Sequence, residues 1–370
     1  MRILTAVTYY SPYVSGLTNV AKDLSEGLAA RGHQVQVLTT RHDPALPARE
    51  EINGVKIRRA WAPLRVSKAA VAPGFIPEFV RLSARADVAH VHAPLPEAGA
   101  LARLARCPVI LTYQCDASVG SGSVAKLIER ALDVSHTSAA RAAKLVFVSS
   151  EDYAQYSRIA SELLVKSEVL YPPARQRPTG TPKFRETTGL HVGFLGRVVR
   201  EKGIPQLIRA FRRIDDRSAR LLVAGDYEQV AGGSIIEEVR KEASGDNRIR
   251  IMGRLSESEI ADFHASIDVF CLPSTDSLEA FGIVQSEALI AGVPVVASDR
   301  PGVRVPVQLA GVGEVVDVHD PEKLASALVR VSGVDAGAQV SRLTSLFGLE
   351  GIVSQYEGIL LEIVSGAIEK

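Results

Sequence analysis

Short apolar runs alternate with amphipathic segments along this chain of 370 residues. In the first half, apolar runs of strand length lie at residues 3–8, 35–40, 88–93, 109–113 and 145–149. Between the first two runs, a helix is expected at residues 19–31, where Val20, Leu24 and Leu28 share one face and Gly32 is placed to end the helix. Buried strands that alternate with helices are typical of a parallel sheet, so the pattern predicts an α/β fold.

The alternation stops at residues 171–186, which are rich in proline and charge and have little apolar periodicity. This composition is typical of a linker. Beyond it, strands are expected at residues 191–196, 219–225, 248–253, 268–273 and 294–298. We therefore predict two α/β domains, at residues 1–175 and 186–348, followed by a long amphipathic helix at residues 349–370.

Composition and charge narrow the function classes. The chain is 46% hydrophobic and 23% charged, which is typical of a soluble globular protein. Its 43 basic and 42 acidic residues give a net charge of +1, which argues against a dedicated nucleic-acid-binding protein. The three cysteines are widely spaced and show neither a disulfide framework nor zinc-ligand spacing, so we expect a protein of the reducing cytoplasm.

Nothing in the sequence predicts insertion into a membrane. The start of the chain is too short and too polar for the apolar region of a signal peptide, and no run approaches the roughly 18 apolar residues of a membrane span. Peripheral contact with an acidic membrane surface stays open, because residues 56–68 are basic and contain the single tryptophan. We favour a simpler interpretation, in which this segment is a solvated edge strand and loop.

A strand, a glycine-flanked turn and two cations follow one another at residues 193–203. Arg197 and Lys202 lie between the end of the strand and the start of a helix, where free backbone amides and the positive helix end attract anions. We favour a phosphate site here over two solvated loop charges. The G-x-G-x-x-G order of a dinucleotide-binding turn is absent, which argues against a dehydrogenase.

Two carboxylates flank the start of a helix that is expected at about residues 283–290. The free amides there suit phosphate, whereas Glu279 and Glu287 repel phosphate and accept hydrogen bonds from hydroxyl groups. A nucleotide sugar offers phosphates between two rings that carry hydroxyls. The alternative is structural: Glu279 complements the helix N-terminus, with Asp276 as a candidate cap, and Glu287 is an ordinary exposed helix residue.

Polar residues also follow the strands of the first half. Gly16, after the first strand, would let backbone come close to a ligand or simply form a turn. His90 is expected to be structural, whereas His92 could be structural or functional. Gln114 and Asp116 follow the next strand along the chain, at the edge where parallel sheets bind ligands.

Several segments together resemble glycosyltransferase family 4, whose members are retaining glycosyltransferases with the GT-B fold. "EAFGIVQSE" fits the E-x7-E motif of that family, "ARGHQVQVLTT" its second strand, "GRVVREKG" its phosphate turn and "GVPVVASDRPGVRVPV" the segment after the motif helix. The resemblance covers nearly the whole chain. It implies two Rossmann-like parallel-sheet domains facing a central cleft, with the acceptor on the N-terminal domain, the donor on the C-terminal domain, and a last helix that crosses back to the N-terminal domain.

The resemblance also implies roles for residues that match the family motifs. The donor's diphosphate would be held by Arg197 and Lys202, its sugar hydroxyls by Glu279, and its ribose by Glu287. Further donor contacts would come from the amides around Phe281, Gly282 and Ile283, from Gly16 in the other domain, and from Arg254 and Leu255 near the base. The acceptor side would use His92, Gln114 and Asp116.

Two positions depart from the family pattern. The first loop has Ser15-Gly16 where paired glycines are common, and Gln114 stands where a histidine often contacts the donor sugar. Glutamine cannot act as an acid or base, so either no proton transfer is needed there or His92 or Asp116 contributes.

The sequence thus favours a retaining glycosyltransferase that uses a nucleoside-diphosphate sugar and no cofactor. No two aspartates lie two positions apart, so we expect no D-x-D metal site, and cations and helix ends would neutralise the diphosphate. The alternatives are a nucleotide-sugar 2-epimerase and a non-catalytic sugar-nucleotide-binding protein. The sequence leaves the sugar, the base, the acceptor and the oligomeric state open, and it predicts no nucleic-acid partner.

Overall fold

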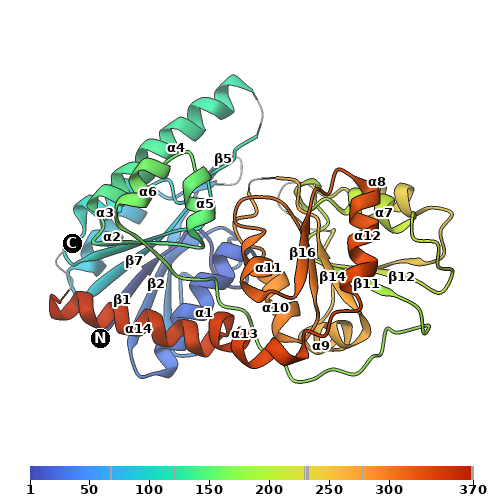
Figure 1. Ribbon diagram of the computed structural model, residues 1–370. Helices are drawn as coiled ribbons and strands as arrows, with labels where there is room; N and C mark the ends of the chain where they lie inside the picture. The colour runs from blue at the N-terminus through green and yellow to red at the C-terminus, as the bar shows by residue number, and fades with distance from the viewer. Residues whose placement is uncertain (67–68, 121, 229, 231–232, 277, 368–370) are drawn as a thin grey trace. The chain divides into compact units, whose positions relative to one another are not determined.

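The computed structural model describes residues 1–66, 69–120, 122–228, 230, 233–276 and 278–367 (Figure 1). The chain divides into two compact units. The first unit is Met1–Pro173 together with Leu349–Lys370, and the second unit is Ala174–Gly348. Each unit is an α/β layer structure built on its own sheet of mostly parallel strands. None of the described helices is both long enough and apolar enough to cross a membrane.

An eight-stranded sheet in the order β10-β9-β8-β7-β1-β2-β4-β3 forms the centre of the first unit. Its strands are β1 (Arg2–Ala6), β2 (Gln34–Arg41), β3 (Arg49–Ile52), β4 (Val55–Trp61), β7 (Val88–Ala93), β8 (Val109–Tyr113), β9 (Leu145–Val148) and β10 (Ser167–Val169), and β5 (Leu64–Val66) and β6 (Ala69–Val71) form a separate hairpin. Among the described strands of this sheet, only β3 runs antiparallel to its neighbour.

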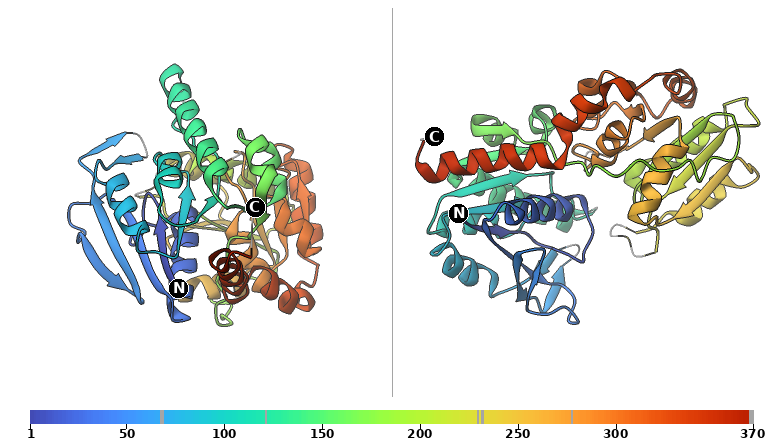
Figure 2. Two further views of the ribbon diagram at one scale, coloured as in Figure 1. Left: turned by 90° about the vertical axis from the view of Figure 1, so that its left-hand side faces the viewer. Right: turned by 90° about the horizontal axis from the view of Figure 1, so that it is seen from below.

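Helices cover both faces of this sheet (Figures 1 and 2). They are α1 (Gly16–Ala30), α2 (Phe75–Ser83), α3 (Ala98–Leu104), α4 (Ser123–Ala142), α5 (Glu151–Tyr156), α6 (Ala160–Lys166) and α14 (Leu349–Ser365). The last of them, α14, packs along α1, where Arg31 and His33 both bond to Glu357. Tyr356 reaches the sheet, and its hydroxyl is hydrogen-bonded to Nδ1 of His90 at 2.5 Å. The C-terminal helix is therefore part of the core of the first unit.

The second unit is built on a six-stranded sheet in the order β13-β12-β11-β14-β15-β16, and every described pair in it is parallel. The strands are β11 (His191–Leu195), β12 (Arg220–Ala224), β13 (Ile249–Gly253), β14 (Val269–Leu272), β15 (Val295–Ser298) and β16 (Gly313–Val316). The helices are η1 (Arg200–Lys202), α7 (Ile204–Phe211), α8 (Ile236–Ala243), α9 (Glu257–Ser266), α10 (Ile283–Ile290), α11 (Val305–Ala310), α12 (Pro321–Val331), η2 (Gly337–Gln339) and α13 (Val340–Phe347).

Each sheet has a switch point, from which the chain adds strands first on one side and then on the other. This point lies between β1 and β7 in the first unit and between β11 and β14 in the second. Open parallel sheets bind ligands beyond the carboxyl ends of their strands at such a switch point. The loops after these four strands are therefore the places where each unit offers a ligand site.

The predicted strands are confirmed in both units, with shifts of a residue or two at their ends. The first helix starts earlier than expected, at Gly16 instead of Asn19, because the side chain of Ser15 caps it by accepting from the amide of Thr18. The basic segment at 56–68 was expected to form an edge strand, and this was wrong. Its strand β4 pairs with β2 on one side and β3 on the other, so β3 is the edge. Residues 67–68 and the last part of the predicted C-terminal helix, 368–370, lie outside the described residues.

Candidate active site

The turn after β11 brings Lys202 to the middle of the second unit. After β11 the chain passes through η1 and reaches Gly203, which has a positive φ of 67°. A Cβ on Gly203 would lie 1.9 Å from the carbonyl oxygen of Pro273, in the loop after β14. Glycine is therefore required for the loops after these two adjacent strands to touch, and the amide of Thr275 donates to the carbonyl of Glu201 at 2.9 Å across the same contact.

Lys202 and Glu279, two of the predicted site residues, meet as an ion pair. Their side chains are only 13% and 17% exposed, so water screens the pair less than it would at an open surface. Arg197 lies on the same turn, with its guanidinium 3.7 Å from Glu201 and its side chain 38% exposed. The turn thus places Arg197 and Lys202 at the switch point of this sheet, where Lys202 meets Glu279 from the loop after β14.

Helix α10 starts next to this pair, at the residue that the sequence predicted. Its N-cap is Gly282, with φ 77°, which offers no side chain to accept from the first amides. A Cβ on Gly282 would lie 2.3 Å from the Leu272 side chain, so this position also needs glycine. The ring of Phe281 is buried against Phe347, so Phe281 can offer a ligand only its backbone. Asp276 accepts from the amide of Leu278 instead of capping the helix, so the alternative in which Asp276 is the cap is wrong.

Glu287 is buried one helical turn further along α10. The residue is 9% exposed, which rules out the alternative of an ordinary exposed helix residue. Burial raises the pKa of the Glu287 carboxyl, and the nearby guanidinium of Arg177, 3.1 Å away, opposes that shift. The sequence did not identify Arg177 as a site residue. It lies in the irregular segment after Ala174, and only the three-dimensional path of that segment places it beside α10.

Arg254 and Leu255 lie in the loop between β13 and α9, at the same edge of the sheet. Arg254 is exposed and Leu255 half-buried. Tyr227, which follows β12, was not identified from the sequence. Its ring lies 3.7 Å from the position of a Cβ on Gly253, and the Arg240 guanidinium packs over the ring at 5.6 Å. The sequence feature that could have identified Tyr227 is an aromatic residue directly after a predicted strand.

In the first unit, Gly16 is the first residue of α1 and is exposed. Among the residues that the structure describes, no heavy atom lies within 4 Å of the position that a Cβ on Gly16 would take, apart from its immediate chain neighbours and the backbone of its own helix. Its φ also lies outside the left-handed region, as the positive values belong to other residues. Packing within this unit therefore does not require glycine here, and a ligand group has room to approach the backbone.

His92 and Gln114 meet at the ends of the adjacent strands β7 and β8, with His92 Nδ1 3.5 Å from the amide nitrogen of Gln114. His92 is fully buried, and its Nε2 has no hydrogen-bond partner among the described residues. Burial lowers the pKa of His92 to about 3, so the imidazole is neutral at ordinary pH. His90 is also buried and bonds to Thr112 and Tyr356, as expected of a structural histidine.

Asp116, the third predicted residue on this side, is a structural acceptor. Its carboxylate accepts from the hydroxyls of Tyr113 and Ser157, at 2.6 and 2.7 Å, and from the amide of Arg158 at 3.2 Å. These bonds tie the loop after β8 to the segment after α5. Within the part of the chain that the structure describes, no three His, Cys, Asp or Glu side chains gather closely enough to hold a metal ion.

Two family models match the chain, one in each unit. Residues 182–332 match the model described as "Glycosyl transferases group 1", and residues 15–162 match the "Glycosyl transferase 4-like domain". The first match contains the paired residues Lys202 and Glu279 as well as Arg197 and Glu287. The chain is a glycosyltransferase with a group 1 domain.

Several known proteins are similar to this chain over most of its length. A phosphatidyl-myo-inositol mannosyltransferase of Mycobacterium leprae is 29% identical, over 92% of each chain. Among solved structures, sucrose-phosphate synthase of Thermosynechococcus elongatus superimposes with a TM-score of 0.77 at 20% identity, over 99% of each chain. HepE of Anabaena, in complex with UDP-glucose, gives a TM-score of 0.72 at 18% identity, over 99% of this chain and all of its own. These structures show that the glycosyltransferase has the GT-B fold.

Proposed function

We propose that this glycosyltransferase transfers a sugar from a nucleoside-diphosphate sugar to a hydroxyl group, without a metal ion and with retention of the anomeric configuration. One observation carries the proposal: Lys202 and Glu279 meet beside the uncapped start of α10 at the switch point of the second sheet. Cations and helix amides bind phosphates, and a carboxylate binds hydroxyls. The complex of HepE with UDP-glucose supports a donor of this class.

Each part of the donor is assigned to protein groups of complementary chemistry. The diphosphate binds to Arg197, Lys202 and the first amides of α10, and the sugar hydroxyls donate to Glu279. The ribose hydroxyls donate to Glu287, which Arg177 holds in place at 3.1 Å. The base lies near Arg254 and Leu255, where the ring of Tyr227 is also found.

The proposed mechanism depends on the negative charge that develops on the departing diphosphate. The bond between the anomeric carbon and the diphosphate oxygen breaks, and the acceptor oxygen forms a new bond on the same face of the sugar. The acceptor's proton passes to the departing phosphate oxygen. Lys202, Arg197 and the α10 amides stabilise the negative charge on the leaving group, and preorganised groups of this kind contribute about 10²–10³ each in rate.

A thermal-shift screen with UDP-, GDP-, ADP- and dTDP-sugars tests the donor class. We expect the nucleotide sugars of one base to raise the melting temperature of the protein, because a ligand that binds only the folded state stabilises it.

Two further measurements test the metal independence and the stereochemistry of the reaction. Transfer should continue in the presence of EDTA, and NMR of the product should show the anomeric configuration of the donor. If no nucleotide sugar stabilises the protein, the donor assignment is wrong; epimerised donor in the absence of acceptor would support an epimerase instead.

Replacing Arg177 by glutamine is expected to change the pH dependence of donor binding. The Glu287 carboxyl has a raised pKa, and donor affinity should fall as the pH falls through it, because the protonated carboxyl is a weaker acceptor for ribose hydroxyls. Arg177 lowers this pKa. Its removal should therefore move the loss of affinity to higher pH.

Donor dissociation constants measured by calorimetry at a series of pH values check this shift. Lys183→Gln is the matched control, since Lys183 lies on the same segment but is exposed and 4.0 Å from Glu259. The same pH profile in Arg177→Gln and in the unchanged protein would contradict a role for Arg177 in holding Glu287 ionised.

A further inference from the structure

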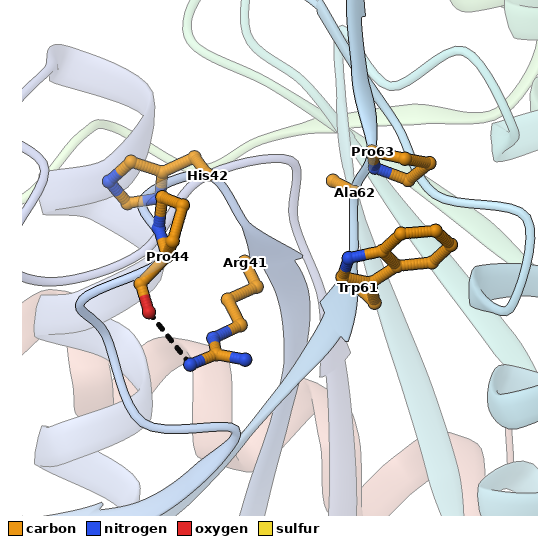
Figure 3. Close-up of a pocket in the computed structure, with 6 residues that line it drawn as sticks. All are labelled: Arg41, His42, Pro44, Trp61, Ala62 and Pro63. Atoms are coloured by element: carbon orange, nitrogen blue, oxygen red, sulfur yellow. Dashed lines mark hydrogen bonds between the residues drawn. The ribbon is translucent and has the colours of Figure 1, made fainter.

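A cavity of about 270 Å³ lies at the carboxyl edge of the first sheet, and its lining residues are not among those assigned to the donor (Figure 3). It is lined by Arg41, His42, Pro44, Trp61, Ala62 and Pro63. Arg41 and Trp61 are the last residues of β2 and β4 and are paired in register. Paired residues of parallel strands lie side by side on one face of a sheet, so the fold itself sets these two side chains next to each other.

Arg41 gives the cavity a fixed positive charge. Its Nε donates to the carbonyl of Leu46 at 2.6 Å and its Nη2 donates to the carbonyl of Pro44 at 2.8 Å, which is the bond drawn in Figure 3. These bonds hold the guanidinium in place and leave three of its five N–H groups for a ligand. No ion pair between Arg41 and a carboxylate occurs among the described residues, and no acidic side chain lines the cavity. The cavity therefore favours an anion.

Trp61 gives the cavity an aromatic face. It is 68% exposed and is the single tryptophan of the chain. An indole combines a large flat apolar surface with one N–H donor, and binding sites use such side chains for ring-shaped ligands that are apolar on one face and polar at the edge. A sugar or cyclitol has this character, because its C–H groups pack on the indole while its hydroxyls point sideways.

The cavity adjoins the loop that precedes α1. Tyr9 and Tyr13 of this loop stack on each other at 4.6 Å between ring centres, and both meet the ring of His42 edge-on, at 5.3 and 5.5 Å. His42 lines the cavity, so three rings connect it with the segment that ends at Gly16. The cavity thus belongs to the same ligand-binding edge of the first unit.

We propose that this cavity binds the acceptor of the transfer reaction, and that the acceptor is a sugar or cyclitol ring that carries a phosphate. The ring packs on Trp61, and the phosphate accepts hydrogen bonds from Arg41. This inference rests on the proposed function, since it names the substrate class of the same reaction. It assigns a role to the aromatic and basic positions of residues 41–63, which the donor site does not use.

The intrinsic fluorescence of Trp61 reports binding directly, without any catalysis. We expect glucose 6-phosphate or myo-inositol 1-phosphate to change the emission in a saturable way, and glucose, myo-inositol and inorganic phosphate to bind at least about ten-fold more weakly. Arg41→Gln should remove the preference for the phosphorylated ring. Arg103→Gln, an exposed arginine on α3, should not. Equal binding of phosphorylated and neutral rings to the unchanged protein would overturn the proposal.

Vesicles distinguish a free phosphate ester from a lipid headgroup. A response of Trp61 to vesicles with phosphatidylinositol, but not to vesicles with phosphatidylserine, supports a phosphorylated ring presented on a lipid. If Trp61 responds to neither kind of vesicle but the soluble phosphate esters bind, the acceptor is a free phosphate ester. An equal response to both kinds of vesicle, without binding of the soluble esters, would mean that Trp61 senses a charged bilayer, and this would overturn the proposal.

Kinetics separate this inference from the proposed function. Trp61→Ala should raise the KM for the acceptor about ten-fold or more while the donor-induced thermal shift stays the same, and Trp61→Phe should recover most of the loss. Leu104→Ala, which removes another exposed apolar side chain of the first unit, is the control. If the unchanged protein neither binds donor nor transfers sugar, the proposed function fails. If it transfers sugar and Trp61→Ala keeps the acceptor KM, only the acceptor site is wrong.

Discussion

Replacing Lys202 by alanine is expected to lower kcat of sugar transfer by about 10²–10³-fold, because the departing diphosphate loses a preorganised cation. The protein should still fold. Lys202 lies in a turn rather than in the apolar core, and the loss of its pair with Glu279 removes one charge-assisted contact, which costs about 1–3 kcal/mol. A lowered kcat with a largely preserved melting transition would separate the catalytic role of Lys202 from a structural one.

The matched control lies on the same turn of helix. Arg200 is 74% exposed and pairs with Glu238 at 2.8 Å, so Arg200→Ala removes a cation and an ion pair without touching the candidate site. We expect this variant to keep its turnover. Single-turnover measurements at saturating donor compare the two variants. Wild-type turnover in Lys202→Ala would refute the assignment of this residue.

The fold was largely predictable from the hydrophobic pattern, since buried parallel strands are nearly continuous apolar runs. The strands β7 and β8 begin and end where the sequence placed them. The pattern did not identify β3 and β10, because these short strands are only partly buried and have no clear apolar run. Nor did it predict the start of α1, which depends on a hydrogen bond of one serine side chain.

The predicted site depended on a different kind of information. Lys202 and Glu279 are 77 positions apart, and they meet because β11 and β14 are adjacent in the sheet. Motifs that match a family reveal such a pair, although strand adjacency is not visible in the hydrophobic pattern. Arg177 follows no strand and matches no motif, so only the folded path of its segment reveals its pair with Glu287. The pair of Arg41 and Trp61 likewise needs the register of β2 and β4.

Replacing Glu279 by alanine is expected to reduce sugar transfer about as strongly as replacing Lys202, by about 10²-fold or more, but for a different reason. In the structure Glu279 is bound to Lys202, the same cation that the diphosphate is proposed to use. The carboxylate and the diphosphate therefore compete for Lys202. Without Glu279, the free nucleoside diphosphate should bind as tightly as before or more tightly, while the additional affinity due to the sugar ring is lost.

The ratio of the dissociation constants of the nucleotide sugar and the nucleoside diphosphate measures this effect. Glu279→Gln divides the two roles, since glutamine still accepts a hydrogen bond from a sugar hydroxyl but no longer attracts Lys202. It should therefore keep more of the sugar's contribution than alanine does. Glu238→Ala, from the exposed pair with Arg200, should leave the ratio unchanged. If Glu279→Ala weakens the binding of both ligands equally, Glu279 acts only by positioning Lys202, and its proposed contact with the sugar is wrong.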